Sequence, residues 1–223
     1  MEAEEIKVSG QAEEYLEAIY RLEKKMGSAK TMDLARQLKV VPGSITNTIE
    51  RLERRGLVIH EPYKGVKLTE KGQKLALNVL RRHRLAERLL TDILQMKWSN
   101  AHETACKLEH AISEDMIKPL EKALKHPQTC PHGNPIPTKC GVILEKETEP
   151  LTGLKTGDSA TIVKITEERH DLLQRLDTLG LKPGETVRIK EKTPIEGLIV
   201  VRVGRADHTL SHDLASVIRV RKL

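Results

Sequence analysis

Aromatic side chains are almost missing from this chain of 223 residues, which has no Phe, one Trp and three Tyr. A stacking platform for single-stranded nucleic acid is therefore not expected. The three cysteines are an odd number, which argues against a disulfide scaffold and fits a reducing compartment. No apolar run approaches the roughly 18 to 20 residues of a membrane span, and the acidic start lacks the features of a signal peptide. We therefore expect a cytoplasmic protein with no membrane partner.

The residues that are present favour several small domains. Hydrophobic residues make up 38% of the chain, enough for modest cores but little for one large enzyme core. At roughly 150 residues per domain, this length predicts two or three domains. The net charge is +6, and the stretch from Lys30 to Lys74 holds ten basic and five acidic residues. Most of the positive surplus therefore lies in one N-terminal segment.

That basic segment has the pattern of a winged helix-turn-helix. Apolar residues at helical spacing predict helices over residues 11–25, from Thr31, and from Pro42 to Gly56. Proline suits the first turn of the third helix. A β-hairpin over residues 57–69, with its turn at Pro62 to Gly65, follows. Helix, turn, helix and hairpin in this order indicate a DNA-binding domain over residues 1–74.

The third predicted helix has an apolar face and an outward face of small polar side chains. Such side chains near a helix start can reach base edges in the major groove, and Asn suits adenine. Basic residues at the helix end and in the hairpin can contact phosphates. The alternative is a surface helix whose polar residues are only solvated. The candidate DNA contacts are Ser44, Thr46, Asn47, Thr48, Arg51 and Lys64.

The remainder of the chain changes from helical to strand patterns. Helices are predicted over residues 70–95, 101–113 and 114–124, followed by a proline-rich stretch at 126–150. Beyond Pro150, four short apolar segments, at 160–165, 186–190, 198–203 and 217–221, have the character of strands around one helix at 171–179. The fold class is therefore mainly α with a small β part. We predict domains at 1–74, 75–140 and 151–223, with a linker at 141–150.

The strongest chemical signal is a set of metal-binding side chains at helical spacing. His83 and Glu87 are four residues apart, so they share one face of the long helix. The next helix carries a second stripe, and together the two helices offer His83, Glu87, His102, Cys106, Glu109 and His110. Imidazole, carboxylate and thiolate together suit Fe(II), Mn(II), Co(II), Ni(II) or Zn(II) rather than calcium or magnesium. One stripe holds too few ligands to close a site, so other segments must contribute.

Two other interpretations of these residues stay open at this point. The stripes can be solvated helix faces with Glu paired to Arg88 or Lys107, although six such residues in register make that harder to sustain. Cys130 and Cys140, with His132 between them, can bind a metal ion in the proline-rich stretch, but their spacing gives this interpretation little support.

Several of these segments together resemble one known family. The resemblance lies in His83-Arg-Leu-Ala-Glu-Arg-Leu-Leu-Thr-Asp, in the run from His102 to His110, and in Gly133-Asn-Pro-Ile-Pro137. They resemble the diphtheria-toxin-repressor family of metal-dependent transcriptional repressors, and the resemblance covers nearly the whole chain. The segment Leu179-Gly-Leu-Lys-Pro-Gly184 is similar to the SH3-like domain that these repressors share with a small ferrous-iron-transport protein.

The resemblance implies a homodimer that binds double-stranded operator DNA when metal is bound, and neither an enzyme nor a small-molecule binder. It implies a helical dimerisation and metal-binding domain before an SH3-like β-barrel domain. An ancillary set of ligands would be His83, Glu87 and His102. A primary set would be Cys106, Glu109, His110 and one residue of the first helix, here Glu14. The family's operator contacts fall on Ser44, Thr46 and Asn47.

This sequence departs from the family pattern at two places. Iron-type members carry Met and manganese-type members Asp where Glu14 stands, whereas Cys106 follows the iron type. In iron-type members the SH3-like domain donates a Glu and a Gln to the ancillary set. The aligned residues here are Arg169 and Leu172, which cannot bind a metal, and substitution by Glu167, Glu168, His170 or Asp171 is open.

The sequence thus predicts a repressor of metal-uptake genes that responds to Fe(II), with Mn(II) as the alternative. Co(II), Ni(II) or Zn(II) are expected to substitute in vitro. A metallohydrolase would need an open coordination position, a general base and a substrate pocket, and would leave the winged-helix segment unexplained. A DNA-binding protein that ignores metal is a further alternative, which chelation would distinguish.

Overall fold

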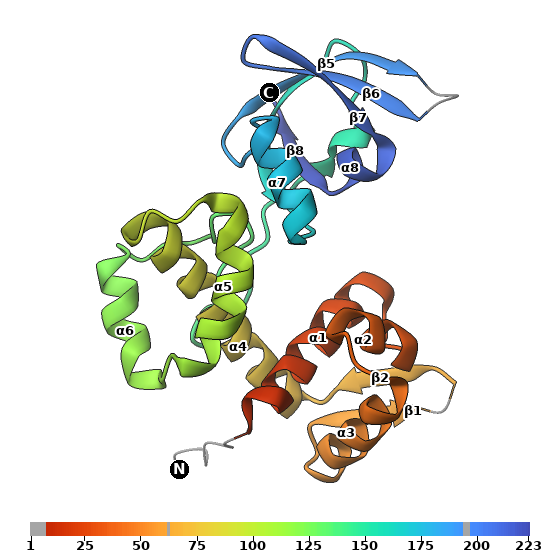
Figure 1. Cartoon of the computed structure of the whole chain (residues 1–223), viewed down its shortest axis with the longest axis vertical. Coiled ribbons are helices and arrows are strands. Elements are labelled where there is room, and N and C mark those ends of the chain that lie inside the picture. The colour runs from red at the N-terminus through yellow and green to blue at the C-terminus, as the bar shows by residue number, and fades with distance from the viewer. Residues whose placement is uncertain (1–7, 62, 194–196) are drawn as a thin grey trace. The chain divides into compact units, whose positions relative to one another are not determined.

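A computed structural model describes residues 8–61, 63–193 and 197–223 and divides the chain into two compact units. One unit combines Met1–Arg82 with Pro137–Val142, and the other combines His83–Ile136 with Ile143–Leu223. We describe each unit by itself (Figure 1). The division into domains at residues 74, 140 and 150 is finer than this partition and stays a prediction. Within the described ranges, no helix is long and apolar enough to cross a membrane.

The first unit has the predicted winged-helix arrangement. Its elements are α1 (Gly10–Met26), α2 (Thr31–Leu38), α3 (Pro42–Arg54), β1 (Val58–Glu61), β2 (Gly65–Leu68) and the start of α4 (Glu70–Arg88). The side chain of Ser9 caps α1, and Gly27 ends it in the left-handed conformation that glycine adopts at low cost. Pro42 occupies the first turn of α3, as predicted. α2 begins at Thr31, as predicted, and its N-cap residue is Lys30.

A short hairpin completes this unit. Strands β1 and β2 pair antiparallel, with Val58 opposite Leu68, and Pro62 of the predicted turn lies outside the described residues. The backbone of Ala29 pairs with Val66, which adds one bridge to the sheet. Gly65 is required there, because its φ is +103° and a Cβ would come within 2.7 Å of the Ala29 carbonyl oxygen. The hairpin is thereby fixed to the helices.

The helices of the second unit are more irregular than predicted. α4 ends at Arg88 and is followed by a π-helical turn (Leu89–Ile93). The prediction of one α-helix up to Gln95 is therefore wrong for its last part. The Thr91 hydroxyl donates to the Glu87 carbonyl at 3.1 Å and competes with the helical bond there. After a 3-10 turn (Trp98–Asn100) come α5 (Ala101–Leu108), a second 3-10 turn (Glu109–Ala111) and α6 (Glu114–Ala123).

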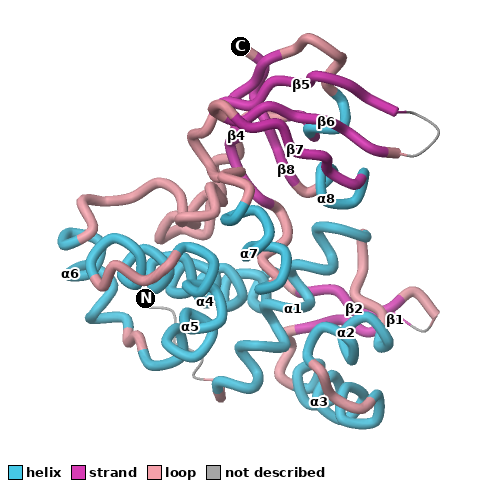
Figure 2. Tube along the Cα trace, turned by 45° about the horizontal axis from the view of Figure 1, so that its top comes forward, coloured by secondary structure: helices cyan, strands magenta, loops and turns pink. Residues whose placement is uncertain are grey.

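The C-terminal part of this unit is a small antiparallel sheet with two helices (Figure 2). The strands occur in the order β3-β8-β4-β5-β6-β7. In chain order the elements are β3 (Glu149–Pro150), a 3-10 turn (Leu151–Gly153), β4 (Ser159–Ile165), α7 (His170–Thr178), β5 (Thr186–Thr193), β6 (Leu198–Val203), β7 (Ala206–Ser211), α8 (His212–Ser216) and β8 (Ile218–Lys222). β3, β7 and α8 were not predicted from the sequence. Strand β7 is mostly exposed and therefore has little apolar pattern.

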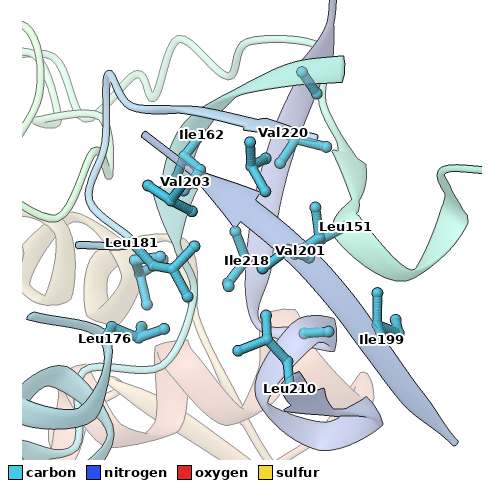
Figure 3. Close-up of a cluster of buried hydrophobic side chains, with 14 of the residues drawn as sticks. Leu151, Ile162, Leu176, Leu181, Ile199, Val201, Val203, Leu210, Ile218 and Val220 are labelled. Atoms are coloured by element: carbon cyan, nitrogen blue, oxygen red, sulfur yellow. The ribbon is translucent and has the colours of Figure 1, made fainter. Parts of the chain in front are cut away.

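Buried aliphatic side chains hold this sheet and its helices together. Figure 3 shows Ile162 of β4, Leu176 of α7, Leu210 of β7 and Val220 of β8 converging on one core. Burying each such side chain contributes roughly 1.5–3 kcal/mol. This core makes the sheet a firm support for the loop between β4 and α7.

Candidate metal centre

The predicted ligand stripes of α4 and α5 meet in the second unit. His83 and Glu87 lie one turn apart on α4, and both are buried. His102 lies on α5, and its Nδ1 is 3.0 Å from His83 Nε2. Ligand-type atoms of His83, His102 and Cys106 all lie within 4.8 Å of one another. The two stripes therefore form one cluster rather than two solvated faces.

The Glu87 carboxylate is the centre of this cluster. Its Oε1 lies 3.1 Å from His83 Nε2 and 3.2 Å from His102 Nδ1. The same oxygen lies 3.1 Å from His132 Nδ1. The side chain is fully buried, and its Oε2 has no hydrogen-bond partner within the described part of the chain. A buried carboxylate oxygen without a donor is costly, and a cation beside it would remove that cost.

Glu168 brings the C-terminal sheet into the cluster. It lies in the loop between β4 and α7, buried, with Oε2 3.5 Å from His102 Nδ1. Asn134 donates to its Oε1 at 2.8 Å. Ligand-type atoms of His83, Glu87, His102 and Glu168 all lie within 4.8 Å of one another. The resemblance to iron-type members placed the expected carboxylate at Arg169, which is one position after Glu168 and is exposed.

The other residues left open beside Glu168 are elsewhere. His170 is 3.9 Å from Glu103, and Asp171 is 3.8 Å from Arg169. Glu167 belongs to none of the ligand groups found among the described residues. Of the four alternatives, only Glu168 faces the candidate centre.

Cys130 and His132 are the ligand-type residues that sequence reasoning undervalued. Both are buried, and both join Glu87 and Glu168 in a group whose ligand-type atoms lie within 4.8 Å of one another. Cys140, their suggested partner, is exposed and belongs to no such group in the described residues. The available signal was the Cys-Pro-His run itself rather than a pairing of two cysteines.

Backbone contacts fix the orientation of the His132 ring. Its Nε2 lies 3.2 Å from the Trp98 carbonyl oxygen, so that nitrogen is positioned to donate. Trp98 Nε1 donates in turn to the Pro131 carbonyl at 2.8 Å. A hydrogen bond to one ring nitrogen commonly fixes the other as a metal ligand. Here the other nitrogen is Nδ1, which faces Glu87.

A second group of predicted ligands lies next to this cluster. His83 Nδ1 is 2.5 Å from Glu109 Oε2, and His110 Nε2 is 3.3 Å from Glu109 Oε1. The exposed Cys106 has its Sγ 3.9 Å from His102 Nε2. Glu14 belongs to the first unit, on the exposed side of α1. The primary set of Glu14, Cys106, Glu109 and His110 therefore stays a prediction.

The carboxylates of the cluster raise the pKa values of the imidazoles beside them. Burial opposes protonation of His83, but Glu87, Cys106 and Glu109 hold its pKa well above the usual value. His102 behaves in the same way: burial opposes the charge, while Cys106 and Glu87 raise the pKa to about 9. Burial would raise the pKa of Glu87, yet His83 and His132 hold that pKa well below its usual range. Positive charge is thus already required here, and a divalent cation can replace the protons.

The two thiols of this unit differ in character. Burial, together with the carboxylates of Glu87 and Glu168, raises the pKa of Cys130 well above its usual value. Burial also opposes ionisation of Cys106, but His102 and His83 outweigh it and lower the pKa of that thiol. Nitrogen, carboxylate oxygen and thiol sulfur together match a first-row transition metal better than magnesium or calcium. The residues present therefore fit a bound metal ion.

The predicted DNA contacts on α3 are exposed with one exception. Ser44, Thr46, Asn47 and Arg51 have exposed side chains, whereas Thr48 is buried among the helices. Thr48 directly precedes Ile49 and lies on the apolar face, so its burial gives no support to the predicted base contact. Lys64 in the hairpin is exposed and forms an ion pair with Glu61 at 2.9 Å.

Comparison with known protein families covers almost the entire chain. Residues 7–66 match the iron dependent repressor N-terminal DNA binding domain. Residues 69–138 match the iron dependent repressor metal binding and dimerisation domain. Residues 149–222 match the FeoA domain. The winged helix, the helical part and the small sheet thus each correspond to a known domain type.

Individual relatives match over the same length. The iron-dependent repressor IdeR of Mycobacterium tuberculosis is 37% identical, over 95% of this chain and 96% of that protein. The diphtheria toxin repressor of Corynebacterium diphtheriae is 33% identical, over 95% and 96%. A solved manganese-dependent transcriptional repressor complex with manganese superposes with a TM-score of 0.85 at 28% identity, over 95% of this chain and all of that one. Together with the ligand cluster, these matches place the chain in the diphtheria-toxin-repressor family of metal-dependent repressors.

Proposed function

We propose that this protein is a transcriptional repressor that binds operator DNA as a homodimer when loaded with Fe(II), and that it controls metal-uptake genes. The observation that supports this most directly is the buried Glu87 carboxylate, whose Oε1 faces three imidazoles and whose Oε2 has no donor among the described residues. A protein without a metal has no evident use for this costly arrangement. The relatives named above are repressors, which connects such a centre with DNA binding.

In this proposal two sets of ligands have different tasks. The ancillary set of His83, Glu87 and His102 is completed by Glu168 from the loop after β4. The primary set is Glu14, Cys106, Glu109 and His110. A bound ion supplies positive charge that neutralises the carboxylates and links the segments that carry them. His83, which contacts both Glu87 and Glu109, would connect the two sets.

The choice between Fe(II) and Mn(II) depends on few residues. Thiolate and imidazole ligands favour Fe(II), Co(II) and Ni(II), whereas a charged oxygen lowers the penalty for Mn(II). Cys106 therefore favours Fe(II), whereas Glu14 makes Mn(II) more acceptable. One solved relative is named as a manganese-dependent repressor, so Mn(II) is the second candidate. We propose Fe(II) first, because thiol groups occur both at Cys106 and at Cys130.

The metal choice can be tested at Glu14, which departs from the family pattern, and at Cys106, which follows the iron type. We expect Glu14→Met to reduce activation by Mn(II) relative to Fe(II), and Cys106→Glu to shift the ratio the other way. Operator binding should be titrated with each metal at one fixed salt concentration, since affinity for DNA depends on ionic strength. An unchanged activation ratio in both variants would show that neither residue sets selectivity.

The DNA-binding half of the proposal rests on α3 and the hairpin. Ser44, Thr46 and Asn47 are exposed near the start of α3, where side chains can reach base edges. Arg51 and Lys64 are exposed cations that can contact phosphates. Two copies of the chain would place two such helices on a palindromic operator.

The decisive experiment is operator binding measured anaerobically with Fe(II), Mn(II), Co(II), Zn(II) or a chelator in parallel. We expect Fe(II) to activate at the lowest concentration and the chelator to abolish specific binding. Glu87→Gln removes the central charge with almost no change of shape and should greatly weaken activation. Binding that is equally strong under chelation would indicate a metal-independent DNA-binding protein instead.

A further inference from the structure

The tip of the hairpin presents an exposed aromatic side chain. Tyr63 lies between the ends of β1 and β2, and its relative accessibility of 105% makes it fully exposed. Within the described ranges its side chain has no hydrogen bond, ion pair or ring contact. By contrast, Tyr15 and Tyr20 are buried in α1, and Trp98 packs against the core of the C-terminal sheet. Tyr63 is thus an aromatic residue that the fold does not use.

The backbone of Tyr63 is unfavourable for its residue type. Its φ is +66°, in the left-handed region where the Cβ of a bulky residue costs free energy. The other described residues with this conformation that are not glycine follow helices, whose ends it commonly closes: Lys39, Gln95, Lys125 and His126. Tyr63 ends no helix. An exposed aromatic residue alone needs no explanation, but one that is held in a strained conformation points to a function.

The turn that presents Tyr63 is held in place by the segment between α1 and α2. The hydroxyl of Ser28 donates to the carbonyl of Lys64, the residue after Tyr63, at 2.7 Å. The backbone N–H of Val66 donates to the Ala29 carbonyl at 2.8 Å, and that of Ala29 donates to the Val66 carbonyl at 3.0 Å. The fold therefore determines where the ring of Tyr63 stands relative to the helices of its unit.

The hairpin is also fixed to α3, the helix proposed to enter the major groove. Glu53 of α3 accepts a hydrogen bond from the backbone N–H of His60 in β1 at 3.0 Å, and Figure 1 shows the hairpin beside α3 in the same unit. The major groove is about 12 Å wide, and a helix with its side chains is about 10–12 Å across. One helix fills the groove, so an element packed beside α3 lies over the sugar–phosphate backbone at the rim.

The chemistry of the hairpin tip suits that backbone. A tyrosine ring offers an apolar face to a deoxyribose, and its hydroxyl can donate to a phosphate oxygen, as tyrosines do in protein–DNA interfaces. Lys64 and Lys67 are exposed cations of the same hairpin and attract phosphates. Contacts of this kind carry no information about base identity, so the ligand of Tyr63 is the backbone rather than a base edge.

We propose that Tyr63 is a positioning residue that contacts the sugar–phosphate backbone at the flank of each half-site, on the minor-groove side of the strand next to α3. The contact fixes the depth and angle at which α3 enters the major groove, and it reads no base. The strained backbone of Tyr63 then lowers stability in favour of DNA binding. The inference rests on the proposed function in one respect, that α3 enters the major groove.

The test compares stability with DNA affinity. The probe is a duplex that the Co(II)-loaded protein selects from a random library. Tyr63→Asn removes the ring and places a residue that tolerates the left-handed conformation, so it should raise the melting temperature by about 2–4 °C. The same variant should bind the selected duplex roughly 2- to 12-fold more weakly for each hairpin, and Tyr63→Phe should lose less. Leu144→Ala, at an exposed position outside the winged helix, is the control and should change neither quantity.

Footprinting with hydroxyl radicals locates the contact, because these radicals cleave DNA at sugar carbons that are accessible from the minor groove. The unsubstituted protein should protect sugars at the flank of each half-site. Tyr63→Asn should lose that protection and no other, whereas Asn47→Ala should retain it. Because tyrosine is neutral, Tyr63→Asn should leave the salt dependence of binding unchanged, whereas Lys64→Ala should flatten it.

The inference and the proposed function fail in different ways. If Tyr63→Asn binds the selected duplex with unchanged affinity and an unchanged footprint, the inference is overturned while the proposed function stands. If the variant is less stable and loses protection equally at every position, the ring supports the fold and makes no separate contact, which also overturns the inference. If the Co(II)-loaded protein selects no duplex, or if chelation leaves its DNA binding unchanged, the proposed function itself fails.

Discussion

A proton and a metal ion compete for the same ring of His102. The pKa of this histidine is raised to about 9, because Cys106 and Glu87 outweigh the effect of burial. Below that pH the ring carries a proton in the metal-free protein, and an ion can bind only after displacing it. The carboxylates that stabilise the proton are the same groups that stabilise the ion.

Metal affinity should therefore rise with pH. Between about pH 6 and pH 9, each unit should strengthen Co(II) binding at this centre by up to about tenfold per displaced proton, and the contribution of His102 should end near pH 9. The measurement is calorimetry in buffers of different ionisation enthalpy, which reports the protons released. His102→Ala should release fewer protons. Affinity that does not change from pH 6 to 9 would contradict the raised pKa.

Neighbouring residues of α3 should have opposite roles. Asn47→Ala removes an exposed candidate base contact and should weaken specific operator binding by about 1–3 kcal/mol, with little change in salt dependence. Thr48→Val, at a buried position, should leave the preference for operator over random DNA unchanged. Arg51→Ala should instead weaken binding to all sequences and flatten the salt dependence. Equal losses on operator and random DNA for Asn47→Ala would exclude the base contact.

At the scale of elements, the loop from Thr129 to Ile136 positions side chains of the candidate metal centre that its sequence pattern did not predict. His132 accepts a backbone hydrogen bond from Ile165 at 2.9 Å, so the loop lies directly against β4. Gly133 allows this approach, because its φ is +84° and a Cβ would come within 2.0 Å of the Val163 carbonyl oxygen. The loop thus determines where Cys130, His132 and Asn134 meet Glu168.

Gly133→Ala should therefore damage both stability and metal binding. We expect a loss of about 1–3 kcal/mol in the free energy of unfolding and weaker Co(II) binding, because the loop must move away from β4. Gly157→Ala is the matched control: its φ is also positive, at +92°, but no atom lies within 4 Å of the added Cβ. The positive φ alone should cost about 1–2 kcal/mol, less than the loss at Gly133, and metal binding should stay intact. If both substitutions lower stability and Co(II) affinity equally, the close approach of Gly133 to Val163 does not matter for the centre.

The elements that sequence analysis predicted well are those with a strong local pattern. The three N-terminal helices and the hairpin follow from apolar spacing together with Pro42 and Gly27. His83 and Glu87 were found because a helix fixes their spacing. Cys130, His132 and Glu168 come together only through the folding of a loop onto a distant sheet, and no periodicity in the sequence encodes that. Strand β7 was missed for the related reason that most of its residues are exposed.

At the scale of the whole molecule, metal binding and DNA binding must be linked if the proposed function is correct. Ligands from the first helix and from the helical part would be joined by one ion, which would select arrangements of the DNA-binding domains that fit two half-sites. Such coupling between sites is typically about 1–3 kcal/mol, and it is reciprocal by thermodynamic necessity. Operator DNA must then strengthen metal binding by the same factor with which metal strengthens DNA binding.

This reciprocity can be measured directly. The affinity for Co(II) should be about 5- to 150-fold higher in the presence of operator DNA than in its absence, which corresponds to that coupling. Random DNA of equal length and charge is the control and should have a smaller effect. Glu14→Ala removes the proposed ligand of the first helix and should reduce the coupling while leaving the buried Glu87 centre able to bind an ion. If Co(II) affinity is the same with and without operator DNA, the metal does not regulate DNA binding by linking these segments.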